Sequence, residues 1–158
     1  MVTEHQIITI LHLHVYYQMV HHIQEHMHSQ ARDIMIKNPV SVQSSRTVIQ
    51  GMEIMRTNKV DSLLVKDKED NFIGIITIKE LRQNGIQNHY LSDIMNKEPL
   101  FVYDDNNLVE ILEVMNRENI GHIPVITRYN KLAGLITRSS LLSVLSEQFL
   151  EMEVSVLG

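Results

Sequence analysis

Among the first 90 residues, the pair best suited to do chemistry is Thr77 and Glu80, which stand three positions apart at the expected start of a helix. A Thr followed three residues later by Glu forms a capping box, in which both side chains satisfy free amides of the first helical turn. The same helix start offers amides, the positive end of the helix dipole and the Thr hydroxyl to a phosphate. The sequence leaves both roles open for this pair.

A second stretch, Thr137-Arg138-Ser139-Ser140, keeps the threonine but differs in charge. It has Ser140 in place of the carboxylate and gains Arg138. A guanidinium binds phosphate through paired donors, whereas a serine cannot accept two hydroxyl protons as a carboxylate does. This stretch therefore favours a phosphate over a ribose. The alternative is a solvated Arg138 that pairs with an acid such as Glu147.

Histidines near the N-terminus could provide a metal site. Seven of the nine histidines lie in the first 28 residues, and His22 and His26 would share a helix face at a spacing that can chelate a transition metal. The sequence favours a different interpretation, a helix that buries an apolar stripe against the rest of the chain or a partner. The stripe repeats every four residues and consists of Ile7, Leu11, Val15, Met19, Ile23 and Met27. We therefore predict no resident metal.

His122 stands alone, without a nucleophile or an orienting carboxylate in its motif. A histidine that acts as a general base in catalysis works together with such groups. We predict that His122 packs or binds, and that the chain is not an enzyme.

Composition narrows the function further. The 158 residues are 44% apolar and 21% charged, which suits one domain with its own core. The lack of Cys excludes disulfides, thiolate zinc and thiol nucleophiles, and a formal net charge of −5 disfavours binding to nucleic acid. The longest apolar-leaning stretch, residues 7–20, is too short and polar to span a bilayer, and no signal-peptide pattern is present. We expect a cytoplasmic protein without membrane insertion.

The chain contains an internal repeat with an offset of 60 residues. Residues 33–39, Asp-Ile-Met-Ile-Lys-Asn-Pro, return as residues 93–99, Asp-Ile-Met-Asn-Lys-Glu-Pro. The offset holds without insertion and aligns Gly74 with Gly134. A unit of about 60 residues buries too little surface to be stable alone, so we expect two copies packed about a pseudo-twofold axis.

Each copy has the pattern of a β-α-β-β-α unit. In the first copy we expect a helix capped by Ser44 or Ser45, a second helix from Thr77 to Gly85, and strands at residues 40–42, 62–65 and 72–76. In the second copy we expect helices at residues 107–117 and 138–149 and strands at residues 100–102, 122–127 and 131–136. The predicted fold class is α+β with an N-terminal helical leader. The predicted divisions are residues 1–30 for the leader, 31–90 and 91–150 for the two units, and 151–158 for a tail.

These motifs resemble a tandem pair of cystathionine-β-synthase (CBS) domains, a Bateman module, over residues 31–149. The resemblance rests on the Pro-headed first strand, on Gly121-His122-Ile123-Pro124-Val125, and on the paired segments that begin at Gly74 and Gly134. Residues 59–65 and 136–142 further resemble the C-terminal regulatory region of ATP-binding subunits of glycine betaine, carnitine and choline ABC transporters. The chain has no G-x-x-x-x-G-K-[ST] phosphate loop, so the resemblance implies a sensor without the ATPase.

The resemblance implies a regulatory module that binds an adenine nucleotide as its ligand and uses no cofactor. Cyclic di-adenylate is the ligand expected for the transporter group, with AMP or ATP next. Carried over position by position, the adenine and phosphate pocket would be lined by Val40, Val60, Ser62, His122, Leu135, Thr137 and Arg138. In the family, an acidic residue at the position of Glu80, beside Thr77, binds the ribose hydroxyls. For the apolar members of the set, a core role is an equal alternative.

The resemblance also implies a homodimer through the CBS helices and control of an attached or partner protein, with an osmoprotectant ABC transporter preferred. The apolar positions available for that interface, or for the core, are Val109, Leu112, Met115, Leu141, Leu142 and Leu145. The alternative function is a structural dimerisation element without a ligand, in which Thr77, Glu80 and Thr137 are helix caps only. A third hypothesis makes the leader a metal sensor.

Overall fold

The computed structural model describes residues 1–26, 28–84, 89–144 and 146, without the side chains of residues 19, 20 and 22–26. A long N-terminal helix, α1 (Glu4–His26), precedes the repeated part of the chain. The first unit contains α2 (Ala31–Ile34), β1 (Ile36–Lys37), β2 (Ser41–Gln43), α3 (Val48–Asn58), β3 (Ser62–Lys66), β4 (Phe72–Thr77) and α4 (Ile78–Asn84). The second contains α5 (Leu91–Ile94), β5 (Val102–Tyr103), α6 (Leu108–Arg117), β6 (His122–Ile126), β7 (Leu132–Thr137) and helical residues 138–144. The predicted β-α-β-β-α order is confirmed in both units.

One predicted helix cap is wrong. Thr47, not Ser44 or Ser45, precedes α3, because a turn at residues 44–45 separates the serines from the helix. The Thr47 hydroxyl oxygen accepts the Gln50 N–H at 3.2 Å, and the Gln50 side chain accepts the Thr47 N–H at 3.0 Å. In α6, the predicted start at Asn107 is the cap, with Glu110 as its partner. Gly85 and residues 147–149, where two predicted helices would end, lie outside the described residues.

The strands form two sheets that repeat one pattern. In the first unit β2 pairs parallel to β3, which pairs antiparallel to β4. In the second, β5 pairs parallel to β6 and β6 antiparallel to β7, and β1 from the first unit adds to the far edge of β7. The matching contact in the first sheet is a single bridge between Ile75 and Asn96. The segment before β2 therefore adds to the edge of the second sheet, and the segment before β5 contacts the edge of the first sheet.

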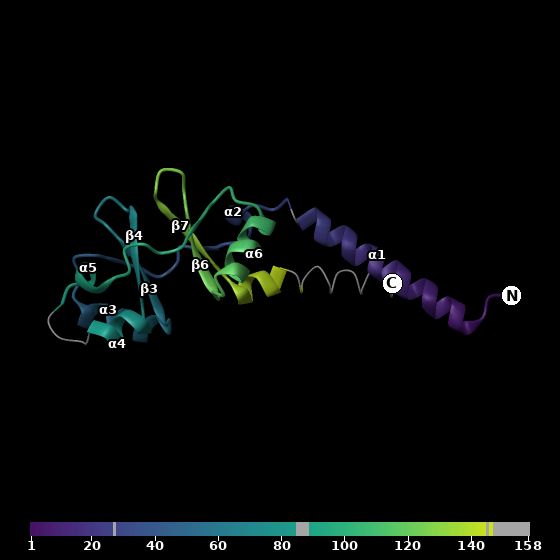
Figure 1. The fold of residues 1–158 in the computed structure, drawn as a ribbon, viewed down its shortest axis with the longest axis horizontal. Helices are drawn as coiled ribbons and strands as arrows, with labels where there is room; N and C mark the ends of the chain where they lie inside the picture. Colours follow the sequence, from purple (N-terminus) through teal and green to yellow (C-terminus); the bar gives the residue numbers. More distant parts are fainter. Residues whose placement is uncertain (27, 85–88, 145, 147–158) are drawn as a thin grey trace.

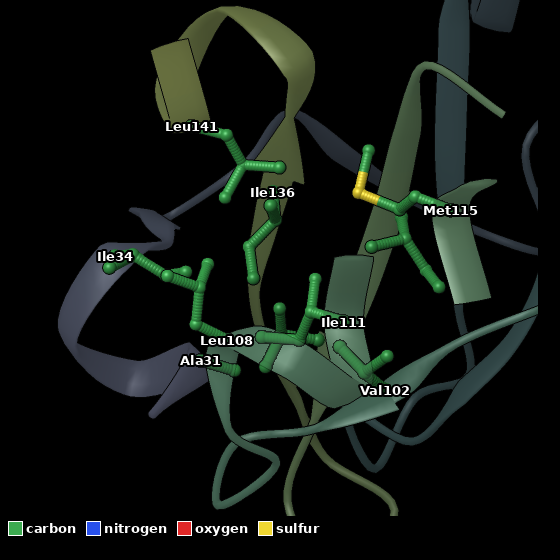
Figure 2. Packing of buried hydrophobic residues seen from close by; sticks show 10 residues of the cluster. Ala31, Ile34, Val102, Leu108, Ile111, Met115, Ile136 and Leu141 are labelled. Atoms are coloured by element: carbon green, nitrogen blue, oxygen red, sulfur yellow. The ribbon is translucent and has the colours of Figure 1, made fainter. Parts of the chain in front are cut away.

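The same exchange completes the hydrophobic cores. Ala31 and Ile34 of α2 are buried in the core of the second unit, where they pack among residues of α6 and β7 (Figure 2). Leu91 and Ile94 of α5 are buried in the core of the first unit. A third buried group, containing Leu64 of β3, lies between the two sheets and consists of Leu64, Phe72, Ile75 and Ile126. The two units therefore form one body with exchanged arms.

Helix α1 extends away from the two units (Figure 1). Its start is capped by Thr3 and Gln6, which exchange hydrogen bonds of 2.9 and 3.3 Å. Ile7 and Leu11 are each 49% exposed and Tyr17 is 69% exposed. The predicted burial of an apolar stripe against the rest of the chain is therefore wrong for Ile7 and Leu11, whereas Val15 is half-buried. Burial against a partner stays a prediction. Within the described residues, no helix is long and apolar enough to cross a bilayer.

Candidate functional site

A cavity of about 630 Å³ lies between the two units. Residues of the first unit form one wall and residues of β6 and β7 form the other. Six of the nine predicted site residues line it, namely Val40, Val60, Ser62, His122, Leu135 and Thr137. We call this space the first cavity. The structure thus brings together most of the set that the sequence assigned to one pocket.

The walls of the first cavity are positioned by regular structure. Ser62 and His122 each begin the central strand of a sheet and pair with Thr77 and Thr137, respectively, on the neighbouring strand. Because side chains alternate along a strand, Leu135 and Thr137 point to the same face of β7. The cavity therefore lies where the starts of β3 and β6 meet the end of β7.

Lys59 supplies a cation that the sequence analysis missed. It ends α3 in the left-handed conformation, with φ of 55°, and the Val60 N–H then donates to the Met55 carbonyl at 3.0 Å. This turn brings Lys59 and Asp61 to the cavity wall. The signal in the sequence is weak, because the turn after a helix usually carries Gly or Asn at this position.

Arg138 lies outside the first cavity in this structure. It lines a separate hollow of about 380 Å³ with Asn119 and Leu141, and its guanidinium is 3.4 Å from the Asn119 side-chain oxygen. Its backbone is close to the first cavity, since the Arg138 N–H donates to the Gly121 carbonyl at 2.9 Å. The predicted contact between Arg138 and phosphate stays a prediction.

Thr77 lines a second cavity, of about 280 Å³, at the pseudo-equivalent position between the units. Eight of its ten lining residues stand 60 positions from a lining residue of the first cavity: Ile75, Thr77, Asn96, Leu100, Ile120, Gly121, His122 and Pro124. Gly121 and His122 line both cavities. The internal repeat has therefore produced two related sites that share one strand start.

Glu80 is buried and does not line either cavity. Its carboxylate accepts the Thr77 N–H at 2.7 Å and the Thr77 hydroxyl at 2.5 Å. In the second unit Ser140 takes this role: its hydroxyl oxygen accepts the Thr137 N–H at 2.9 Å, and its N–H donates to the Thr137 hydroxyl oxygen at 2.9 Å. Both pairs thus adopt the capping arrangement, and the ribose contact of Glu80 stays a prediction.

The site has no metal-binding constellation among the residues that could be searched, since no three His, Cys, Asp or Glu side chains in the described part of the chain gather around one point. The side chains of His22 and His26 lie outside the described residues. The first cavity instead offers apolar walls, one ammonium group, one carboxylate and hydroxyls. Such a set suits reversible binding of an amphipathic small molecule.

Comparisons with known proteins agree with this fold. The CBS domain family model matches residues 31–85 and 91–147. The glycine betaine/carnitine/choline transport ATP-binding protein OpuCA of Bacillus subtilis is 29% identical over 111 residues, which cover 70% of this chain and 29% of that protein. The chain thus spans less than a third of that relative.

Solved structures share the arrangement. Staphylococcus aureus OpuCA is 27% identical with a TM-score of 0.64, over 73% of this chain and 97% of that chain. A structure of CBSX2 in complex with AMP has the same fold at 21% identity and a TM-score of 0.67, over 75% of this chain and 96% of that one. With two matched segments that coincide with the two repeated units, the chain belongs to the CBS domain family and carries its domains as a tandem pair.

Proposed function

We propose that the chain is a non-catalytic regulatory module whose first cavity binds an adenine nucleotide, with cyclic di-adenylate preferred and AMP or ATP next. The observation that carries the proposal is the composition of this cavity, where apolar walls from both units meet Lys59 and the Thr137 hydroxyl. A nucleotide has the same two parts, an apolar purine face and an anionic phosphate. The AMP held by CBSX2 and the similarity to OpuCA support this class of ligand.

In this proposal the purine lies between Val40, Val60 and Leu135, and the polar groups of Ser62 and His122 contact its edge. The phosphate lies toward Lys59 and Thr137. The Thr137 hydroxyl oxygen already accepts the Ser140 N–H, which leaves the hydroxyl proton to donate to a phosphate oxygen. Arg138 would become a second phosphate contact if its guanidinium left Asn119.

Ligand binding would regulate an attached or partner protein by favouring one arrangement of the units. We propose that the chain itself lies in the cytoplasm and that its partner is an osmoprotectant ABC transporter, on the similarity to OpuCA. We further propose that two chains associate through the CBS helices. Ile49 of α3, Leu112 of α6 and Leu142 remain exposed on these helices and supply an apolar face.

The test is isothermal titration calorimetry of the full chain with cyclic di-adenylate, AMP and ATP. We expect saturable heat with at least one of them, and loss of that heat in Val40→Trp, which fills the first cavity. Leu100→Trp, the same change at the pseudo-equivalent position in the second cavity, is the matched control and should retain it. Absence of heat with all three nucleotides would contradict the proposal.

The second candidate is a structural dimerisation element without a ligand. The hydrogen bonds of Thr77 with Glu80 and of Thr137 with Ser140 favour it, because they account for these side chains as helix caps. This function predicts a stable dimer whose melting temperature does not respond to any adenine nucleotide.

A further inference from the structure

The two cavities differ in charge although they occupy equivalent positions. The position of Lys59 in the first cavity corresponds to Asn119, which does not line the second. The second cavity instead contains Glu98, 60 residues after Asn38. No Lys or Arg is among the described residues that line it. Each cavity thus has one carboxylate, Asp61 in the first and Glu98 in the second, but only the first has a cation beside it.

The threonine hydroxyls reinforce this difference. In the first cavity the Thr137 oxygen is an acceptor, and no described residue accepts its proton. In the second, the Thr77 hydroxyl donates its proton to the Glu80 carboxylate at 2.5 Å, and the Thr77 N–H donates to the same carboxylate. The Thr77 hydroxyl proton is therefore not available to a phosphate.

The second cavity consequently presents a carboxylate and, among the described residues, no cation to a ligand, with Thr77, Asn96 and His122 as its other polar side chains. Glu98 lies at the wall of the second cavity. Its backbone N–H donates to the Asn96 side-chain oxygen at 3.0 Å, and within the described residues its carboxylate accepts no hydrogen bond. An anion at this position would meet the charge of Glu98 with no cation to compensate, which is unfavourable even in a solvated site. Ribose hydroxyls or an amino group would instead find partners there.

The size of the cavity points in the same direction. Its volume of about 280 Å³ is less than half of the first cavity's 630 Å³. Pockets for drug-sized molecules span roughly 300 to 1,000 Å³, so this space suits a ligand at the small end of that range. Its apolar walls, Ile75, Pro99, Leu100 and Ile120, can still cover one flat ring.

We propose that the second cavity binds an uncharged or cationic nucleoside and rejects its phosphorylated form, so that one chain binds two ligands of different charge. The choice of a nucleoside rests on the proposed function, because we infer it from the nucleotide proposed for the first cavity and from the equivalent positions of the two cavities in the repeat. The charge preference rests on Glu98, Thr77 and Glu80 alone.

The test compares adenosine with AMP by calorimetry on the full-length Val40→Trp variant, in which the first cavity is filled. We expect adenosine to bind at one site per chain and AMP to bind at least tenfold more weakly. Glu98→Gln removes the charge without changing the shape of the side chain. It should lower the ratio of the AMP and adenosine dissociation constants by about fivefold, the factor for one like charge a few ångström away across water. Leu100→Trp should abolish the adenosine site.

Equal affinities for adenosine and AMP in Val40→Trp, or a ratio that Glu98→Gln leaves unchanged, would overturn the proposal. If Val40→Trp does not fold, wild-type protein saturated with cyclic di-adenylate replaces it, and failure of adenosine to bind there would also overturn the proposal. The two proposals fail separately. Adenosine binding without any nucleotide binding would contradict the proposed function only, whereas nucleotide binding at one site without adenosine binding would contradict only the inference drawn from Glu98.

Discussion

At the scale of the residue, Lys59 and Arg138 show what the sequence could and could not predict about the site. Arg138 follows a conspicuous helix-start motif, and yet its guanidinium contacts Asn119 outside the first cavity. Lys59 has no motif, because its place on the cavity wall depends on one left-handed backbone conformation at the end of α3. Lysine carries little local preference for that conformation, so a sequence pattern does not reveal it.

Lys59→Asn should weaken nucleotide binding to the first cavity by about tenfold, because a hydrogen bond to a charged group contributes about 1.5 kcal/mol. The Asn mimics the pseudo-equivalent Asn119 and tolerates the left-handed conformation, so the fold should be kept. Calorimetry with AMP measures the change, and Arg138→Asn, which alters the other proposed phosphate contact, is measured beside it. A larger loss in Arg138→Asn than in Lys59→Asn would assign the phosphate contact to Arg138 instead.

At the scale of the element, the sequence predicted the main strands and helices but not the short arms. The strands of each hairpin and helices α3 and α6 carry the apolar periodicity that identifies such elements. The arms α2 and β1 contain four and two residues, too few for any period. Their position depends on contacts with the opposite unit, for which the sequence of one unit contains no local signal.

Gly134→Ala should destabilise the protein by about 1–3 kcal/mol, the usual cost of overpacking. A methyl group at this position would lie 2.5 Å from the Met35 sulfur and 2.8 Å from the Ile36 carbonyl oxygen, so the segment that carries β1 would have to shift against β7. Chemical denaturation measures the free energy of unfolding. Gly121→Ala, where a methyl group meets nothing within 4 Å, is the control and should change it little.

The turn before α6 is tied to the β6–β7 hairpin by an ion pair with a pH dependence. Two hydrogen bonds from Arg128, of 2.9 and 3.1 Å, lower the pKa of Asp105 against partial desolvation. The same guanidinium lies 3.8 Å from the centre of the Tyr103 ring. The folded state thus favours the ionised carboxylate.

Asp105→Asn should therefore lower the melting temperature at neutral pH. The difference from wild type should begin to shrink as the pH falls below about 4, the ordinary Asp range, and vanish below the lowered pKa of Asp105. Thermal melts between pH 7 and pH 2.5 measure it. A difference that is constant over this range would show that Asp105 acts through packing rather than charge.

At the scale of the whole molecule, the repeat predicted two units about a pseudo-twofold axis, and the exchanged arms connect them more closely than the predicted division at residue 90 implies. Residues 31–35 contribute to the core of the second unit and residues 91–95 to the core of the first. At the midline, the Phe72 N–H donates to the Asn130 carbonyl at 2.9 Å and the Lys131 ammonium to the Glu69 carbonyl at 2.6 Å.

A fragment of residues 29–89 should consequently lack a cooperative thermal transition, because it leaves the core of the first unit without Leu91 and Ile94. A fragment of residues 29–97, which retains that arm, is the matched control and should show more helix and a clearer transition by circular dichroism. Equal melting of the two fragments would show that the α5 arm does not stabilise the first unit.

Association of two chains should depend on the exposed helix faces. Met115 and Leu141 of the predicted set are core residues, whereas Val109, Leu112 and Leu142 are exposed; Leu145 lies outside the described residues. Leu112→Glu should shift the protein from dimer to monomer in sedimentation velocity, because a charge there would be buried without a partner. Tyr129→Glu, at a side chain 85% exposed on a hairpin tip, is the control.

The exchange of α2 and α5 between the units also bears on how such a chain could arise. A protein made of one copy would have an arm that fits no part of its own core, and its buried face would lack a cover. Two such proteins could satisfy each other by swapping arms about a true twofold axis, which is a low-cost route to a dimer. Joining two copies of the gene would then make that exchange intramolecular, and each cavity could afterwards diverge by substitutions such as those that distinguish Lys59 from Asn119.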